Sequence, residues 1–145
     1  MYLTIVIDRA RLNELYDEIE REGFTVPAEY RTGWIDNVGG MPFVRFRLYV
    51  EENAIDVDLF LAESAFQREL IHRRQRETLD DHDIWIVTVE DLILLKLIAN
   101  RPRDLLDIQD VRFMHGQLDE DYLRTWADLL QIRDRLEAVL AQPAL

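Results

Sequence analysis

Two aspartates, Asp56 and Asp58, are the residues whose spacing most directly indicates chemistry. They lie in an apolar, β-branched stretch, and residues i and i+2 of a strand project from the same face. Two carboxylates on one face repel each other unless a cation lies between them. Mg²⁺ suits that position because it prefers hard oxygen ligands, although two carboxylates alone do not complete a two-metal site. The alternative is a solvated strand face on which the aspartates pair with Arg45 or Arg47 across a hairpin.

A second group of charged residues surrounds Lys96, which lies in the most apolar segment of the chain. An unpaired buried lysine is costly to desolvate. Lys96 therefore either points into a site that holds carboxylates or phosphate, or extends from the helix edge into water. Asp104 and Asp107 share a helix face three residues apart. Arg101 and Arg103 could contact a phosphate or an acidic partner, whereas the helix dipole alone could explain Asp104.

The composition bounds the class of protein. The chain has 145 residues, of which 48% are hydrophobic and 32% charged, so we expect one domain spanning residues 1–145. Because cysteine is absent, disulfides are excluded and a reducing cytoplasm is the expected location. The net charge of −12 argues against general DNA binding. No apolar run approaches the roughly 18 residues that cross a membrane.

The first 87 residues are predicted to be the sheet-rich part. Residues 2–7 form an apolar run typical of a buried strand, and Asp8 can cap the helix that follows. Residues 43–50 and 55–62 alternate between apolar and polar side chains, which predicts an antiparallel hairpin. These elements indicate a mixed sheet.

Other parts of the first 87 residues have weaker sequence patterns. Residues 24–42 contain two prolines and three glycines, which predicts a loop with a short strand near Trp34. A capping box at Ser64–Gln67 predicts a helix to about Arg74. Residues 79–83 form a polar turn before a short strand at 84–87.

Residues 88–145 are predicted to be helical. A capping box at Thr88–Asp91 precedes a helix that is apolar on nearly all sides and must therefore be buried. Pro102 begins the next helix, Gly116 closes it, and Asp119 caps a further one. The fold class is therefore α/β (α+β), with a helical C-terminal half.

Three segments carry a family resemblance: IDVDLFLAES, FQRELIHRRQRETL and IWIVTVEDLILLKLIANRPRDLLDIQDV. Their order resembles bacterial minimal nucleotidyltransferases of the abortive-infection and toxin–antitoxin type. The resemblance implies a nucleotidyltransferase-like mixed sheet of four to five strands flanked by helices. It also implies Mg²⁺ and a nucleoside triphosphate as cofactors. The implied residues are Asp58, Lys96 and Asp104 for catalysis, Asp56 and Asp58 for metal, and Arg101 and Arg103 for the cofactor.

The resemblance also has departures. Where the family has an Asp-x-Asp at the end of a strand, this chain has Tyr2 and Thr4, and the family's glycine turn and helix would precede Met1. Since metal ions and phosphate donors drive phosphoryl transfer, we expect an incomplete site without cofactors. The expected function is a non-catalytic binding or regulatory protein with a protein partner or in a homo-oligomer. The alternative is a Mg-dependent nucleotidyltransferase acting on RNA or protein, whose site is completed by a partner or a missing N-terminal segment.

Overall fold

The structure is a computed structural model that describes residues 2–7, 9–51 and 53–143, with the backbone alone at residues 2–6 and 50. The chain forms two compact units, and each is described by itself. Helices and strands occur together in this chain, so the predicted mixed α+β class is confirmed.

The two units are residues 1–68 and 69–145, and the boundary between them lies within α3 (Ala65–Arg73). The strands of residues 75–86 therefore belong to the second unit. The predicted sheet-rich part at residues 1–87 and the predicted helical part at residues 88–145 stay predictions. That residues 1–145 are one domain stays a prediction.

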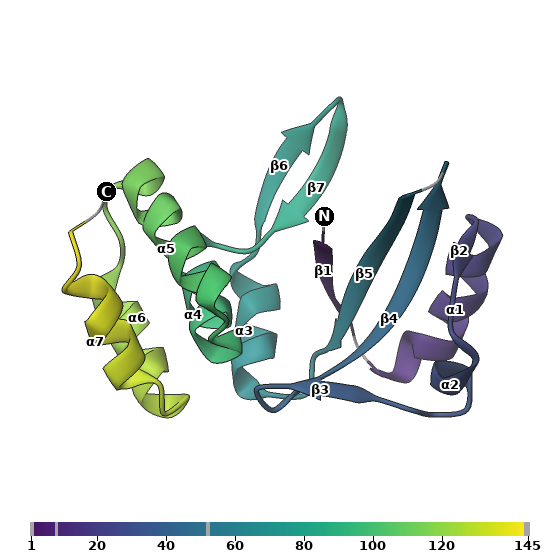
Figure 1. Cartoon of the computed structure of the whole chain (residues 1–145), viewed down its shortest axis with the longest axis horizontal. Helices are drawn as coiled ribbons and strands as arrows, with labels where there is room; N and C mark the ends of the chain where they lie inside the picture. Colours follow the sequence, from purple (N-terminus) through teal and green to yellow (C-terminus); the bar gives the residue numbers. More distant parts are fainter. Residues whose placement is uncertain (1, 8, 52, 144–145) are drawn as a thin grey trace. The chain divides into compact units, whose positions relative to one another are not determined.

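The first unit is built on a sheet with five strands among the described residues. They are β1 (Tyr2–Ile7), β2 (Phe24–Thr25), β3 (Asp36–Val38), β4 (Met41–Val50) and β5 (Asn53–Leu61). The order is β1-β5-β4-β2, with β3 also pairing with β4 (Figure 1). β1 runs parallel to β5, and the other pairs are antiparallel. The predicted strand at residues 2–7 and the β4–β5 hairpin are confirmed.

One face of this sheet packs against α1 (Leu12–Arg21), which follows a short 3₁₀ turn at Arg9–Arg11. The buried side chains Leu12, Tyr16 and Ile19 of α1 join Val44, Phe46 and three β5 residues in the core. Burying this amphipathic stripe is what holds the helix on the sheet. The expected cap Asp8 lies outside the described residues.

The stretch predicted as loop holds more structure than expected. After Pro27, α2 (Ala28–Arg31) forms a single turn and buries Tyr30 in the same core. The short strand lies at Asp36–Val38, close to the predicted place near Trp34. Four residues are too few to show helical periodicity, so the pattern could not predict α2.

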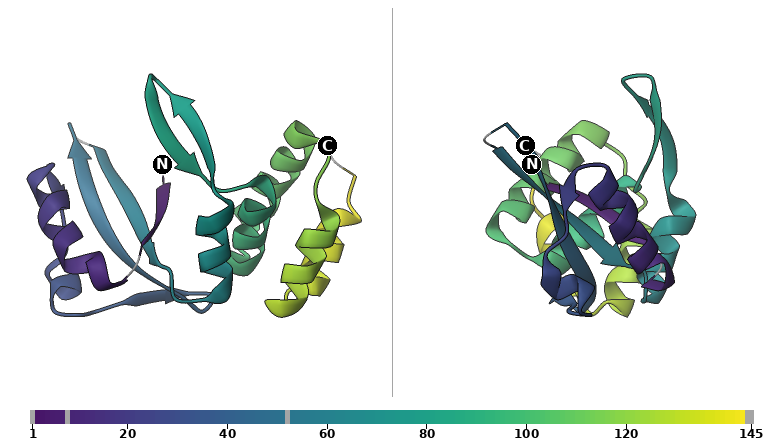
Figure 2. Two further views of the ribbon diagram at one scale, coloured as in Figure 1. Left: turned by 180° about the vertical axis from the view of Figure 1, so that it is seen from behind. Right: turned by 90° about the vertical axis from the view of Figure 1, so that its right-hand side faces the viewer.

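The second unit is mostly helical. Its helices after α3 are α4 (Val89–Ala99), α5 (Pro102–His115), α6 (Glu120–Leu129) and α7 (Arg133–Leu140). α4 packs against α5, α6 and α7 (Figure 2). Its residues Ile93, Leu94 and Leu97 are fully buried. The predicted buried helix is therefore confirmed. Among the described residues, no helix is both long and apolar enough to cross a membrane.

A two-stranded hairpin connects α3 to α4. Its strands are β6 (Gln75–Leu79) and β7 (His82–Ile86). Both views in Figure 2 show it as an arm that extends beyond the helices of its own unit. β7 matches the predicted strand near residues 84–87. β6 lies between the predicted helix end near Arg74 and the predicted turn at residues 79–83, where no strand was expected.

Candidate functional site

The two aspartates of the first unit lie in a ladder of ion pairs across the β4–β5 hairpin. The strand register sets Arg45 opposite Asp58 and Arg47 opposite Asp56. Arg45 Nε and Nη2 donate to the Asp58 carboxylate at 2.6 and 3.0 Å. Arg47 donates to Asp56 in the same way, at 2.6 and 3.1 Å. Both pairs are bidentate, the strongest geometry for a guanidinium and a carboxylate.

This ladder also decides the charge of the site. The hydrogen bonds from Arg47, followed by the charges of Arg47 and Arg45, hold the pKa of Asp56 below its usual value. The hydrogen bond to Asp58 raises the pKa of Arg45. The aspartate side chains are 18% and 21% exposed and the arginine side chains 38% and 43%, so the pairs are only partly screened by water.

As arranged, the carboxylates of Asp56 and Asp58 do not fit Mg²⁺. A divalent cation would have to displace two guanidinium groups that already neutralise these carboxylates. No group of three or more histidine, aspartate or glutamate side chains that could hold a metal ion occurs within the described residues. The assignment of Asp56 and Asp58 to a metal stays a prediction.

A hollow of about 300 Å³ lies beside this ladder in the first unit. Its charged lining is Glu29, Arg45, Arg47 and Asp56, and its aromatic lining is Tyr30, Phe46 and Tyr49. The hydroxyl of Tyr30 donates to Asp36 at 2.5 Å, and burial followed by this bond raises the pKa of Tyr30. The hollow offers ring surfaces and paired charges, which suit contact with another molecule better than they suit phosphoryl transfer.

In the second unit, four of the predicted residues meet between α4 and α5. Lys96 Nζ donates to Asp107 Oδ2 at 2.6 Å and lies 3.8 Å from Asp104 Oδ1. Asp104 is almost fully buried and accepts from the Arg101 side chain at 2.8 and 3.2 Å. It also accepts from the Arg101 backbone N–H, so it caps the first turn of α5. Arg103 is exposed.

The charges of this cluster compensate one another. Burial favours a higher pKa for Asp104, but the hydrogen bonds from Arg101 and the charge of Lys96 outweigh it and lower the pKa. The carboxylates of Asp104 and Asp107 thus balance the charge of the half-buried Lys96. The prediction that Lys96 and Asp104 act together with Asp58 is not tested, because Asp58 belongs to the other unit.

A buried polar network joins α3, α4 and α6, and the sequence indicated only its Thr88–Asp91 contact. Asp91 is fully buried and accepts from the hydroxyls of Thr88 at 2.7 Å and Tyr122 at 2.6 Å. Arg73 Nε lies 3.4 Å from Asp91, and its guanidinium carbon lies 3.7 Å from the centre of the Tyr122 ring. Burial, followed by the bond to Asp91, raises the pKa of Tyr122. The predicted Thr88 cap is confirmed. The network links three helices through buried polar groups, and such networks rigidify a core when their members are hydrogen-bonded.

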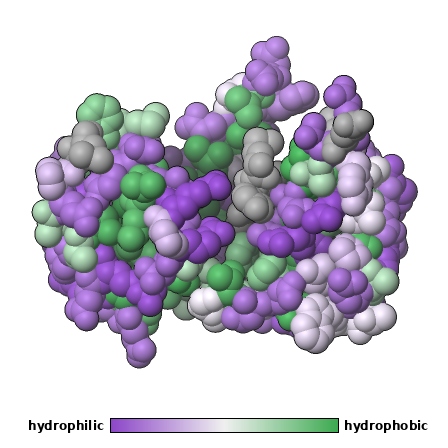
Figure 3. Space-filling model, viewed as in Figure 1, coloured by the Kyte–Doolittle hydropathy of each residue, from purple (hydrophilic) through white to green (hydrophobic). Residues whose placement is uncertain are grey.

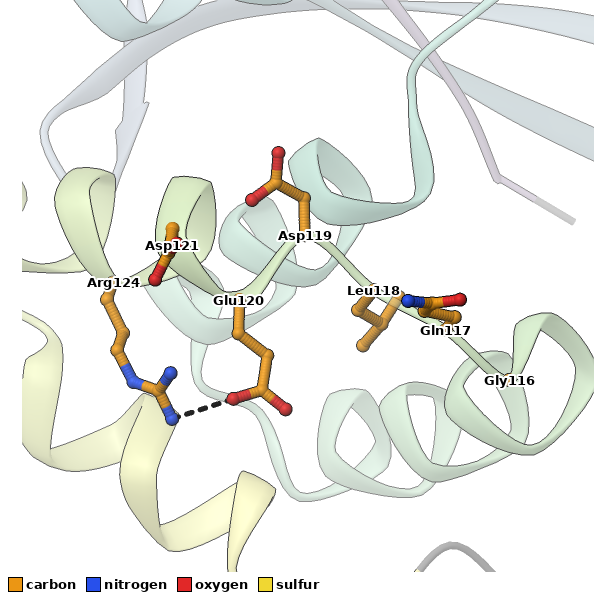
Figure 4. Close-up of a pocket in the computed structure, with 7 residues that line it drawn as sticks. All are labelled: Gly116, Gln117, Leu118, Asp119, Glu120, Asp121 and Arg124. Carbon is orange, nitrogen blue, oxygen red and sulfur yellow. Dashed lines mark ion pairs between the residues drawn. The ribbon is translucent and has the colours of Figure 1, made fainter.

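A second hollow, of about 540 Å³, surrounds the start of α6 in the second unit (Figure 4). Its charged lining is Asp119, Glu120, Asp121 and Arg124. Asp119 caps the helix by accepting from the Tyr122 N–H, and Glu120 pairs with Arg124 at 2.8 Å. Acidic residues at a helix start favour the helix dipole. Because three of the four charged residues are acidic, this hollow does not suit a phosphate.

The chain was also compared with known proteins. No family model matches it, and a search of curated proteins finds no match.

Proposed function

We propose that this chain is a nucleotidyltransferase-like protein that acts by binding a protein partner, in a regulatory role of the toxin–antitoxin kind. The observation that carries the proposal is the pairing of Asp58 with Arg45 and of Asp56 with Arg47. These are the carboxylates to which the sequence resemblance assigns metal binding. In this chain each of them already has a bound cation, supplied by the neighbouring strand.

Displacing the arginine from Asp58 costs a metal ion free energy. Hydrogen bonds to charged groups contribute roughly 1.5–3 kcal/mol each when buried, and exposed ion pairs contribute roughly 0–1 kcal/mol. The partly buried Arg45–Asp58 pair lies between the two cases, so we take about 1–3 kcal/mol for it. A metal ion must supply that free energy before it binds, which weakens its affinity by about 5- to 150-fold when this pair is broken.

Exposed apolar side chains on α5 support the protein-partner part of the proposal. Leu106, Phe113 and Met114 are 66%, 67% and 81% exposed, and they lie seven and eight residues apart. Residues at that spacing share one side of a helix. Exposed apolar patches of this kind are typical of surfaces that bind other proteins.

The proposal is tested by measuring transfer from labelled ATP, CTP, GTP and UTP, with Mg²⁺, onto RNA and onto protein. We expect the wild-type chain and an Asp58→Asn variant to give the same background signal. Transfer by the wild-type chain that is lost in Asp58→Asn would overturn the proposal. A circular-dichroism spectrum of Asp58→Asn matching the wild type is the control for folding.

A second candidate is the Mg-dependent nucleotidyltransferase itself, with its site completed by another chain or segment. The observation that favours it is Lys96, whose amine is held between Asp104 and Asp107 and whose side chain remains 20% exposed. In that case transfer would be lost in both Asp58→Asn and Lys96→Met. Equal activity in wild type and Lys96→Met would exclude this candidate.

A further inference from the structure

The hairpin β6–β7 is a two-stranded sheet with nearly all of its residues exposed. Leu79 and Trp85 are each 59% exposed, and Ile86 is 40% exposed. In Figure 3, hydrophilic atoms cover the tip of this arm and hydrophobic atoms lie below the tip. A lone two-stranded hairpin is only marginally stable in water. Pairing with a further strand would therefore increase the stability of this hairpin.

The tight turn decides which backbone groups of the hairpin are free. Asp80 and Asp81 both have positive φ, 47° and 63°, as a two-residue hairpin turn requires. Leu79 and His82 flank that turn and form a hydrogen-bonded pair. Because hydrogen-bonded and non-hydrogen-bonded pairs alternate along an antiparallel ladder, Asp83 and Trp85 belong to non-hydrogen-bonded pairs. Their backbone N–H and C=O groups therefore point away from β6. Within the described part of the chain, no third strand pairs with them.

The side chains of β7 leave its edge unprotected. Natural edge strands are blocked by lysine, proline, a bulge or an inward-pointing charge. β7 reads His-Asp-Ile-Trp-Ile, and its one acid, Asp83, is bound by Arg76 and Thr78 of β6. Ile84 and Ile86 lie on the same face as Leu79, so this face of the hairpin carries an aliphatic row in which Leu79 and Ile86 are exposed and Ile84 is half-buried.

The charges of the hairpin are arranged from base to tip. Arg74 lies at the base, with its guanidinium carbon 4.7 Å from the centre of the Trp85 ring. Asp80 and Asp81 lie at the tip, six and seven residues after the arginine. An identical hairpin turned end for end would place its basic base beside the acidic tip of the first. The hairpin is therefore complementary to itself across a two-fold axis.

We propose that β7 pairs in antiparallel fashion with β7 of a second copy of this chain, with Ile84 on the two-fold axis. Asp83 then lies opposite Trp85 of the second copy, and the two equivalent pairs contribute about four backbone hydrogen bonds. The result is a four-stranded sheet in the order β6-β7-β7-β6. This register joins the aliphatic rows of both hairpins on one face.

Neighbouring arrangements are less favourable. A two-fold axis at Asp83 sets two aspartates directly opposite each other, and like charges across strands are destabilising. Pairing through the β6 edge around its centre would set Glu77 opposite Glu77 of the second copy, with the same penalty. The β7 edge around Ile84 brings no like charges together and overlaps the whole strand. The pairing does not depend on whether the chain is catalytic.

The absence of cysteine makes a direct test possible, because a single introduced cysteine is the only thiol in the chain. In the proposed dimer the two Ile84 Cα atoms lie about 4.5 Å apart, within the range that a disulfide spans. We expect Ile84→Cys to form a covalent dimer on mild oxidation. Glu77→Cys is the matched control, since Glu77 lies directly opposite Ile84 on β6. The two Glu77 residues are separated by three strand spacings, roughly 14 Å, and should not cross-link.

A second pair of variants tests the edge itself by sedimentation velocity over a concentration series. Asp83→Pro removes the outward N–H of β7, and Thr78→Pro removes that of its cross-strand partner on β6. We expect wild type and Thr78→Pro to be dimers and Asp83→Pro to be monomeric. A monomeric wild type, cross-linking of both cysteine variants to the same extent, or a dimer that persists in Asp83→Pro would each overturn the proposal. A monomer whose β7 amides are protected only by a different protein would also overturn it.

Discussion

Tyr122→Phe removes one hydroxyl from the buried network of the helical unit and nothing else. That hydroxyl donates at 2.6 Å to Asp91, whose side chain is completely buried. A hydrogen bond to a charged group contributes about 1.5–3 kcal/mol, and its loss leaves one carboxylate oxygen without this donor. We therefore expect the unfolding free energy to fall by about 1.5–3 kcal/mol. Because phenylalanine keeps the ring, no cavity adds to this value.

Tyr16→Phe is the matched control within the same chain. Tyr16 is 1% exposed, and its hydroxyl is buried without a hydrogen-bond partner among the described residues. A buried hydroxyl without a partner opposes folding, so its removal should leave stability unchanged or raise it. The two substitutions are chemically identical, and only the presence of an acceptor differs.

The assay is urea unfolding followed by circular dichroism, supported by amide exchange in α4 and α6. Slopes of roughly 1–3 kcal/mol/M are usual for small proteins, so Tyr122→Phe should lower the urea midpoint by about 1 M. Exchange should accelerate in α4 and α6. The reasoning would be refuted if Tyr122→Phe were as stable as wild type, or if Tyr16→Phe lost as much stability.

Other buried groups of the helical unit lead to three more expected outcomes. The pKa of Tyr122 is raised in the folded state, so its contribution to the free energy of unfolding is intact below the unfolded-state pKa of about 10 and is lost as the pH rises above that value. In urea titrations at alkaline pH, wild type should therefore lose stability more steeply than Tyr122→Phe. The pKa of Asp104 is lowered in the folded state, so its contribution to stability is present above about pH 4 and is lost as the pH falls. Asp104→Asn should therefore make the loss of stability at acid pH less steep. An unchanged acid dependence would contradict the role given to Asp104. Leu94→Ala should cost about 2–5 kcal/mol in thermal unfolding because Leu94 is fully buried, whereas exposed Leu129→Ala should change stability by less than about 0.5 kcal/mol.

Sequence patterns predicted the elements that have a strong period or a clear cap. The alternation in β4 and β5 predicted their hairpin, and the continuous apolar run predicted the buried α4. β6 was missed because Gln-Arg-Glu-Thr-Leu has no apolar alternation. Its strand conformation comes from the tight turn at Asp80–Asp81 and from pairing with β7, neither of which periodicity detects.

The candidate site shows the same limit. The two-residue spacing placed Asp56 and Asp58 on one face, and it left both a metal ion and arginine partners open. Only the register of β4 against β5, which pairs Arg45 with Asp58, favours the arginine partners over a metal ion. The bond from Tyr122 to Asp91 joins residues 31 positions apart, so no local pattern could indicate it.

The most direct test of the central claim compares metal binding by wild type and by an Arg45→Gln/Arg47→Gln variant. Free Mn²⁺ is measured by electron paramagnetic resonance as protein is added, with Mn²⁺ standing in for Mg²⁺. The account predicts weak binding by wild type and binding at least about fivefold tighter by the double variant, the lower bound for releasing one ion pair. Removal of Asp58 from the double variant, by Asp58→Asn, should cancel the gain. Wild-type binding as tight as that of the double variant would contradict the claim that arginines occupy the place of the metal.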